Sequence, residues 1–230
     1  MADNDTVVLE VDALLLDCDG VLVDSHEAAA IAWNAWAQTW VPGFDFHRDV
    51  EHGRRIRDLV AELISAPGDV DTAAAELTQR EIDHAADVVE ITGAGRFLAS
   101  CPPGTWAVVT SGSRAIATAR MTSAGLLPAD VLVTSEDVER GKPFPDPYLL
   151  AAQRLGVPAR RCAVFEDAPA GIAAAHAAGV STIVGVGAPA ATASVTVAVE
   201  DLRGVRFDGR RLVIDANTVL PPAERQQSDL

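Results

Sequence analysis

Lysine is almost absent from this sequence: Lys142 is the single lysine beside 17 arginines. Because arginine supplies the positive charge everywhere else, this lysine marks a position where a compact, movable ammonium group matters. Cysteine is also scarce. Cys18, Cys101 and Cys162 are odd in number and widely spaced, which argues against a disulfide framework and favours reduced thiols in the cytoplasm.

Long apolar runs and basic charge are missing as well. No apolar run reaches the roughly 18 residues of a membrane span, and the acidic start does not resemble a secretory signal or a transit peptide. With 33 acidic against 18 basic residues, the formal net charge is −15, which excludes a generally basic, nucleic-acid-binding surface. We therefore expect a cytoplasmic protein with no nucleic-acid and no membrane partner.

What remains is an ordinary globular composition, 49% hydrophobic and 22% charged over 230 residues. That length suits one large domain, or one domain with a sizeable insertion. Short apolar runs, most of them followed by polar residues, are typical of strands buried on both faces. These runs are residues 13–16, 106–109, 131–133, 163–165 and 182–184.

Alanine-rich stretches between these runs end near glycines and predict helices over residues 114–124, 147–155 and 169–178. Strands that alternate with helices in this way predict an α/β fold with a doubly wound parallel sheet. Beyond residue 185 the pattern weakens, and Asp208-Gly209 predicts a hairpin over residues 205–213.

Residues 25–95 interrupt the alternation and contain no convincing strand. Residues 26–40 and 71–91 predict long helices, and three tryptophans (Trp33, Trp36 and Trp40) share one face of the first. We expect this face to pack inside a small helical bundle; a platform for a ligand is the alternative. The predicted division is a core of residues 8–24 and 96–216, a helical module of residues 25–95, and a flexible tail of residues 217–230.

Polar side chains follow the predicted strands at the edge where ligands bind in open parallel sheets. Folding would bring together six of them: Asp17, Asp19, Thr110, Lys142, Glu166 and Asp167. Four converging carboxylates repel one another unless they are protonated or neutralised. A hard divalent cation, Mg²⁺, is the simplest remedy; acids that merely cap turns and helices are the alternative.

We expect Asp17 and Asp167 to bind the metal directly and Asp19 to offer its backbone carbonyl, which leaves the Asp19 side chain free. Glu166 is expected either to bind directly or to support a ligand. Asp17 could then attack a phosphorus atom as a nucleophile. Asp19 could protonate the leaving oxygen and later activate a water, while Gly20 permits the turn between them.

The remaining groups suit a phosphate. Thr110 and the amides of Ser111 and Gly112, at the start of the next predicted helix, could hold phosphate oxygens. Lys142, in a loop stiffened by three prolines (residues 141–148), could neutralise the same phosphate and the charge at Asp17. These roles require the Lys142 amine to lie within about two hydrogen-bond lengths of a cavity shared with the paired acids.

Four segments of the sequence resemble the four motifs of the haloacid dehalogenase-like hydrolase superfamily: residues 17–25, 109–113, 141–148 and 165–179. The helical insertion resembles members with a small α-helical cap between the first two motifs. The resemblance implies a Rossmann-like core, Mg²⁺, an aspartyl-phosphate on Asp17, Asp19 as acid and base, and a cap that opens and closes. Superfamily dehalogenases usually lack the second aspartate, so Asp19 favours phosphoryl chemistry.

A finer resemblance is to glycerol-3-phosphatases and 2-deoxyglucose-6-phosphate phosphatases, which lie close to β-phosphoglucomutase. It includes a cap loop with His52, Arg54 and Arg55. We expect one or two residues of this basic cluster to contact the substrate's phosphate or hydroxyls when the cap closes. A solvated helix face that includes Arg57 is the alternative, and Arg54 and Arg55 cannot both point inward.

The sequence therefore predicts a Mg²⁺-dependent phosphatase for a small sugar or polyol phosphate, as a monomer or weak dimer. An intramolecular phosphosugar mutase and a non-catalytic sugar-phosphate sensor or scaffold are the alternatives.

Overall fold

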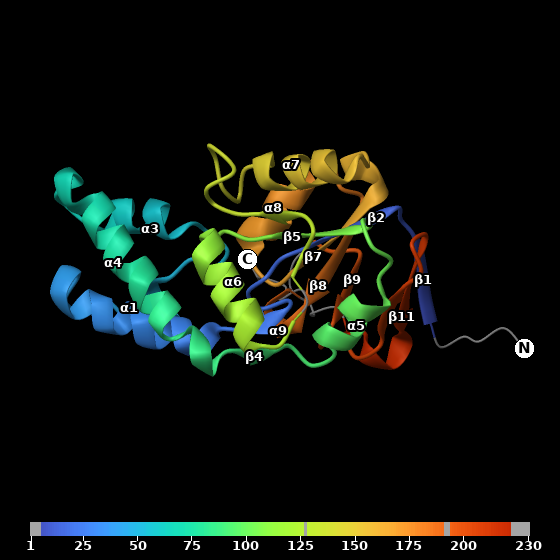
Figure 1. The fold of residues 1–230 in the computed structure, drawn as a ribbon, viewed down its shortest axis with the longest axis horizontal. Coiled ribbons are helices and arrows are strands. Elements are labelled where there is room, and N and C mark those ends of the chain that lie inside the picture. The colour runs from blue at the N-terminus through green and yellow to red at the C-terminus, as the bar shows by residue number, and fades with distance from the viewer. Residues whose placement is uncertain (1–5, 127, 191–193, 222–230) are drawn as a thin grey trace, which may run out of the picture.

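The fold is a parallel α/β core with a helical unit at one end (Figure 1). A computed structural model describes residues 6–126, 128–190 and 194–221. Within them the predicted doubly wound sheet is confirmed, with six parallel strands in the order β6-β5-β2-β7-β8-β9. Their bounds are β2 Ala13–Leu16, β5 Trp106–Val109, β6 Leu132–Val133, β7 Cys162–Glu166, β8 Thr182–Val186 and β9 Val197–Val199. The last of these strands was not expected from the sequence.

The strand order positions the site. From β2 the chain runs to β5 and β6 on one side, then returns to β7 on the other side of β2. The reversal between β2 and β7 leaves a crevice beyond their carboxyl ends, where ligands bind in such sheets. Asp17 directly follows β2, and Glu166 is the last residue of β7.

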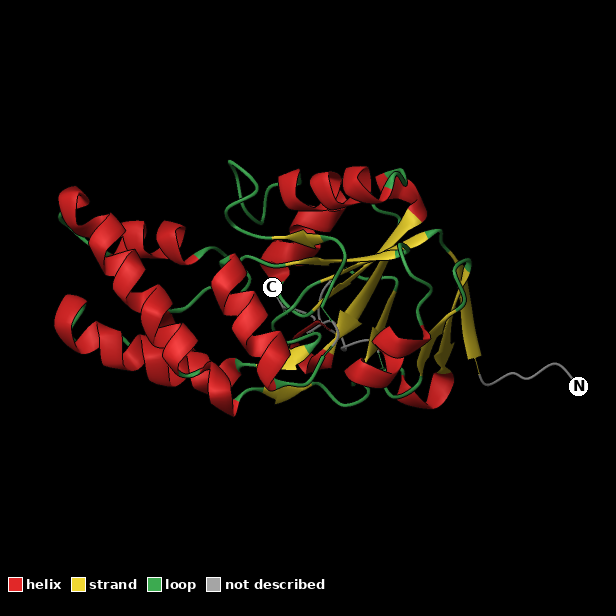
Figure 2. Ribbon diagram, in the orientation of Figure 1, coloured by secondary structure: helices red, strands yellow, loops and turns green. Residues whose placement is uncertain are grey.

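Helices cover both faces of the sheet, as Figure 2 shows. Successive residues of β2 point to opposite faces: Leu14 and Leu16 pack with Phe97 and Met121, whereas Leu15 packs with Tyr148. The covering helices are α5 Ala94–Ser100 and α6 Arg114–Ser123 on one face, and α7 Asp146–Leu155 and α8 Pro169–Ala177 on the other. The three helices predicted in this core are confirmed within two residues at each end. A short helix, α9 (Gly187–Ala190), follows β8.

A small antiparallel sheet extends the core in the order β1-β11-β10, with β1 at Thr6–Glu10, β10 at Val205–Phe207 and β11 at Arg211–Asp215. The hairpin at Asp208-Gly209 is confirmed; β1 was not expected. The start of the expected tail contacts the core: Val219 pairs with Val199, and Leu220 donates to the Ala198 carbonyl. The rest of that tail, residues 222–230, lies outside the described residues.

The helical unit contains α1 (His26–Trp40), α2 (Phe46–Asp49), α3 (Ile56–Leu63) and α4 (Val70–Asp83). The tryptophan face of α1 packs against α4, as expected for a bundle. All three indole N–H groups donate to α4: Trp33 to Glu81, Trp36 to the Ala73 carbonyl and Trp40 to Glu76.

The second long helix is shorter than predicted, since α4 ends at Asp83 rather than continuing to Ile91. A turn of 3-10 helix (Ala85–Asp87) leads to β4 (Val89–Glu90), which pairs antiparallel with β3 (Val23–Asp24). The strand forms because Val88 is buried in the core and Ile91 donates to the Leu22 carbonyl. This pairing joins the two points where the chain leaves and re-enters the core.

Two further findings bear on the sequence analysis. None of the helices among the described residues is long and apolar enough to cross a membrane. Cys18, Cys101 and Cys162 are buried free thiols, and burial raises the pKa of Cys101 and of Cys162 to about 12.

Candidate active site

The floor of the site is an ammonium group between two carboxylates. The Lys142 amine lies 2.8 Å from Asp17 Oδ1 and 2.6 Å from Glu166 Oε1, and it donates to the Val109 carbonyl at 3.1 Å. Lys142 is 1% exposed. Although burial favours the neutral amine, the charges of Asp17 and Glu166 raise the pKa of Lys142, so it stays an ammonium. The single lysine therefore shares a site with the paired acids.

Glu166 is completely buried beneath the pocket and held from several sides. The Tyr148 hydroxyl donates to Oε1 at 2.7 Å, and the amides of Asp167 and Ala168 donate to Oε2. Gly171 makes room for this carboxylate, because a Cβ there would lie 1.6 Å from Oε1. These contacts hold the Glu166 carboxylate from several sides, as is typical of a residue that supports a metal ligand.

Three carboxylates can meet around one ion. Asp17, Glu166 and Asp167 each offer an oxygen, and these atoms lie within 4.8 Å of one another. Burial and the charge of Glu166 raise the pKa of Asp17 to about 8, and the same two causes raise the pKa of Asp167 well above its usual value. Such mutual repulsion is what a bound cation relieves.

The Asp167 carboxylate gives a second indication, besides the cluster of three carboxylates, that a cation binds here. Its buried Oδ1 has no hydrogen-bond partner among the described residues, and a buried oxygen without a partner requires an explanation. Gly20, at φ +75°, lies against the same carboxylate, since a Cβ there would be 2.0 Å from Asp167 Oδ2. An all-oxygen set of this kind fits Mg²⁺.

The Asp19 side chain is directed elsewhere. Its Oδ1 accepts from Ser25 Oγ at 2.7 Å and from the Arg120 guanidinium at 2.7 Å, and Oδ2 accepts a longer bond of 3.4 Å from Thr110. The Asp19 carboxylate is not part of the three-carboxylate group. The Asp19 side chain therefore lies outside the group that could hold a metal, and its role in proton transfer stays a prediction.

The expected phosphate cradle lies at the start of α6. Thr110 Oγ1 accepts from the Gly112 amide at 3.0 Å, and both Ser111 and Gly112 line the pocket. Ser111 Oγ also donates to the Gly53 carbonyl of the helical unit at 2.6 Å. Lys142 is not one of the described residues that line the pocket, so its direct contacts are with the carboxylates rather than with the space for substrate.

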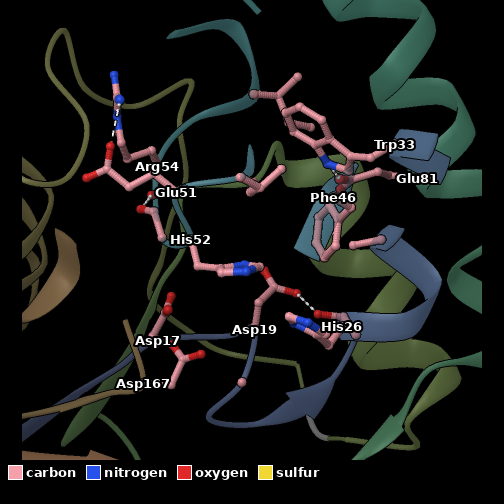
Figure 3. A pocket seen from close by; sticks show the side chains of 18 of the residues that line it. Asp17, Asp19, His26, Trp33, Phe46, Glu51, His52, Arg54, Glu81 and Asp167 are labelled. Atoms are coloured by element: carbon pink, nitrogen blue, oxygen red, sulfur yellow. Dashed lines mark hydrogen bonds and ion pairs between the residues drawn. The ribbon is translucent and has the colours of Figure 1, made fainter. Parts of the chain in front are cut away.

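The helical unit forms the opposite wall of the pocket (Figure 3). His26 and His52 lie ring to ring with centroids 4.8 Å apart, and Phe46 meets the edge of His52 at 5.2 Å. Trp33 also lines this wall, so one tryptophan of the buried face reaches the ligand space as well. Burial and the neighbouring histidines lower the pKa of His52, which favours a neutral ring.

The two arginines of the cap loop diverge, although they precede α3 rather than sharing a helical turn, with Arg55 at its N-cap. Arg54 lines the pocket, where Glu51 (2.9 Å) and Glu62 (2.5 Å) neutralise it. Arg55 is not one of the described pocket residues; its guanidinium pairs with Asp58 and donates to the Glu139 carbonyl. The expectation that Arg55 contacts substrate is therefore corrected: it ties the helical unit to the 138–141 loop, where Gly141 packs against it.

Several residues of the site were not predicted from the sequence. His26, Arg120 and Glu81 line the pocket, and Tyr148 supports Glu166 from below. The burial of Glu81 could have been predicted from the sequence, because its helical spacing continues the buried face of Val70, Ala73 and Leu77 along α4. Tyr148 is the single tyrosine of the chain and closes the proline-rich lysine segment.

The chain is similar in sequence and in fold to known proteins. "Hexitol phosphatase A" of Escherichia coli is 40% identical over 183 residues, covering 77% of this chain and 84% of the relative. "Glycerol-1-phosphate phosphohydrolase 2" of Saccharomyces cerevisiae is 35% identical, covering 76% and 74%. The fold is shared with CbbY from Rhodobacter sphaeroides, solved in complex with phosphate, at a TM-score of 0.73 and 22% identity over 84% of this chain and 95% of that one.

The resemblance to sugar and polyol phosphatases is thereby confirmed at the level of the family. The match to the family described as "haloacid dehalogenase-like hydrolase" extends over residues 11–179 and so includes all four motif segments. The chain belongs to the haloacid dehalogenase-like hydrolase family.

Proposed function

We propose that the protein is a Mg²⁺-dependent phosphatase that hydrolyses a small sugar or polyol phosphate monoester through an aspartyl-phosphate on Asp17. The observation that carries this proposal is the placement of two aspartates with different surroundings at one pocket. Asp17 is fixed by Lys142 within the three-carboxylate group, whereas Asp19 stands outside it. The relatives with matching sequences are phosphatases, and the chain is accordingly a phosphoric monoester hydrolase.

Asp17 is suited to be the nucleophile. Lys142 holds its Oδ1, which leaves Oδ2 to attack the phosphorus atom. Asp17 and Asp167, supported by Glu166, would hold Mg²⁺, whose charge keeps Asp17 ionised and balances the phosphate oxygens. The Ser111 amide would bind those oxygens near the start of α6, and the Gly112 amide, which donates to Thr110 Oγ1, would share its hydrogen with them.

Asp19 is suited to be the acid and base. Its carboxyl gives a proton to the ester oxygen as the P–O bond breaks, and the resulting carboxylate then takes a proton from the water that attacks the aspartyl-phosphate. Its side chain is 31% exposed and lines the pocket, so both the leaving oxygen and a water can reach it.

The walls of the pocket favour a small neutral leaving group. The cavity measures about 130 Å³, far below the roughly 300–1,000 Å³ that hold drug-sized ligands. Arg54 is already neutralised by two carboxylates, and the histidines offer donors and acceptors for hydroxyl groups. We propose that residues 25–95 act as a cap that closes over the substrate and excludes water. A cytoplasmic location and a monomeric or weakly dimeric state stay predictions from the sequence.

The test is phosphate release from glycerol, pentose, hexose and hexitol phosphates and nucleoside monophosphates, with Mg²⁺ or with EDTA. We expect Mg²⁺-dependent release, highest for sugar or polyol esters, and a fall of at least about 1,000-fold in Asp17→Asn. Asp12→Asn, at the opposite end of β2, is the matched control and should retain activity. Undiminished turnover by Asp17→Asn would remove the nucleophile, and isomer formation without phosphate release would establish the mutase instead. Binding without turnover in Mg²⁺ would establish the sensor.

A further inference from the structure

A buried chain of charges connects Asp19 to the helical unit, and the chemistry above does not account for it. Arg120 on α6 is 4% exposed and Glu81 on α4 is 5% exposed. One guanidinium nitrogen of Arg120 lies 2.7 Å from Asp19 Oδ1, and the other lies 2.9 Å from Glu81 Oε2. The Trp33 indole N–H on α1 donates to Glu81 Oε1 at 2.7 Å.

Burial of this ion pair lowers the free energy of unfolding. Burying a guanidinium and a carboxylate removes both from water, and apolar residues of similar volume commonly give a more stable protein. In addition, the buried Arg120 Nε has no hydrogen-bond partner among the described residues, which is a further cost. The buried pair of Arg120 and Glu81 lies beside Asp19, the proposed acid and base. Its presence there, despite its cost in stability, indicates that it positions Asp19.

The contacts of Asp19 show which of its two carboxylate oxygens is held in place. Arg120 and Ser25 both donate to Oδ1, so that oxygen must remain an acceptor. Oδ2 receives just the 3.4 Å contact from Thr110 among the described residues. Oδ2 is therefore the Asp19 oxygen that the surrounding side chains leave for the substrate. The planar fork of an arginine fixes this geometry better than a flexible ammonium would.

We propose that Arg120 and Glu81 are positioning residues: Glu81 orients the Arg120 guanidinium, which in turn fixes Asp19 so that its Oδ2 faces the leaving-group oxygen. This role rests on the phosphatase activity proposed above. Because α4 supplies Glu81 and α6 supplies Arg120, the proton-transfer group is complete while these two helices remain packed together.

The test uses two leaving groups. In the first step, the O–P bond to Asp17 forms and the ester P–O bond breaks. An alkyl leaving oxygen must receive the proton from Asp19, whereas p-nitrophenolate leaves with its electron pair unprotonated.

General acid catalysis contributes about 10²–10⁴-fold to the rate. We therefore expect Arg120→Met to lower kcat/KM for a polyol phosphate by about 100-fold and Glu81→Gln by about 10-fold. For p-nitrophenyl phosphate, kcat/KM should change by less than about 3-fold, because that value ends at the first irreversible step.

Controls separate positioning from folding. Arg114→Met, on the same helix in an exposed pair with Asp137, should leave both substrates unchanged. The double variant Arg120→Met/Glu81→Leu removes both charges, so its melting temperature should return toward that of the unmodified protein while the selective loss of polyol phosphate persists. Arg120→Lys, which keeps the charge, should give an intermediate loss and replaces Arg120→Met if the latter does not fold.

The outcomes are distinct. Equal losses on both substrates, or no loss on either, would overturn the positioning role. Failure of the unmodified protein to release phosphate from either substrate would instead overturn the proposed function.

Discussion

On the core side of the pocket, Asp17, Lys142 and Glu166 are buried and joined by ion pairs shorter than 3 Å. On the side of the helical unit, His26, His52 and Phe46 meet ring to ring, and the one arginine of the cap loop that enters is already neutralised. The core wall thus holds concentrated charge in fixed positions, whereas on the opposite wall aromatic rings predominate and the charged side chains of Arg54 and Glu81 are each held in ion pairs.

The difference follows from the cost of desolvated charge. A buried carboxylate or ammonium is tolerated when its partners hold it in one geometry, and the carboxyl ends of neighbouring parallel strands provide that rigidity. A wall that selects among small hydroxylated ligands needs shape and hydrogen bonds rather than charge, and small changes there shift specificity by about 1–3 kcal/mol. Changes to the core carboxylates or to Lys142 should therefore abolish turnover, while changes to the rings and the cap-loop arginine of the helical unit should redirect it.

The largest effect is expected from Lys142→Met. The substitution leaves Asp17 and Glu166 facing each other without the ammonium, so kcat should fall by at least about 1,000-fold. Loss of one partner of a buried pair should also lower the free energy of unfolding by about 3–5 kcal/mol. Steady-state kinetics and urea denaturation measure the two effects. Arg140→Met, in the same loop but exposed and paired with Asp146, is the matched control. Turnover within tenfold of normal would show that Lys142 is not needed at Asp17.

A smaller effect is expected where glycine makes room for a metal-binding acid. Gly20→Ala places a Cβ 2.0 Å from Asp167 Oδ2 at a φ of +75°, so Asp167 must move and the affinity for Mg²⁺ should fall by about 10–100-fold. Gly179→Ala shares the positive φ of +74° but meets no atom within 4 Å. It should cost roughly 1 kcal/mol of stability with normal Mg²⁺ affinity. Titration of activity with Mg²⁺ compares the two, and equal affinities would contradict the proposed metal site.

The repulsion in the core should also appear as a pH effect on stability. Asp17 has a pKa near 3.8 unfolded and about 8 folded, because of burial and Glu166. Between these values the folded protein binds more protons than the unfolded one, so without metal its stability falls as pH rises. Mg²⁺ competes with those protons, and its stabilising shift in Tm should therefore be larger at about pH 8.5 than at about pH 6. Asp167→Asn should remove most of this difference; an equal Mg²⁺ shift at both pH values would contradict the assignment.

The same comparison explains what the sequence could predict. Asp17, Glu166 and Asp167 were predictable because each ends a short apolar run, and parallel strands bring such ends to one edge. The pair Arg120 and Glu81 was not, because its partners lie 39 residues apart on two helices. No local sequence pattern predicts which faces of α4 and α6 pack against each other.

The two cap-loop arginines, Arg54 and Arg55, show in more detail what cannot be predicted from the sequence. Helical spacing predicted that Arg54 and Arg55 could not both enter the pocket, but it could not tell which would. The choice depends on long-range contacts: Arg55 finds the Glu139 carbonyl, 84 residues away in sequence. Likewise, α4 was predicted too long because the pairing of β4 with β3 is a contact between distant segments that helix propensity does not register.

The smallest effect is expected in the helical unit, from Glu62→Gln. Arg54 lies at the pocket with Glu51 and Glu62 as its partners, so removal of one carboxylate leaves it partly free to bind a second anionic group. We expect kcat/KM for a sugar bisphosphate to rise about 3- to 10-fold relative to the matching monophosphate, the scale of a surface ion pair. Asp71→Asn, which frees Arg57 in an exposed pair outside the pocket, should leave this ratio unchanged. A ratio that is the same in both variants would show that the charge of Arg54 does not act on the ligand. The helical unit would then select by shape alone.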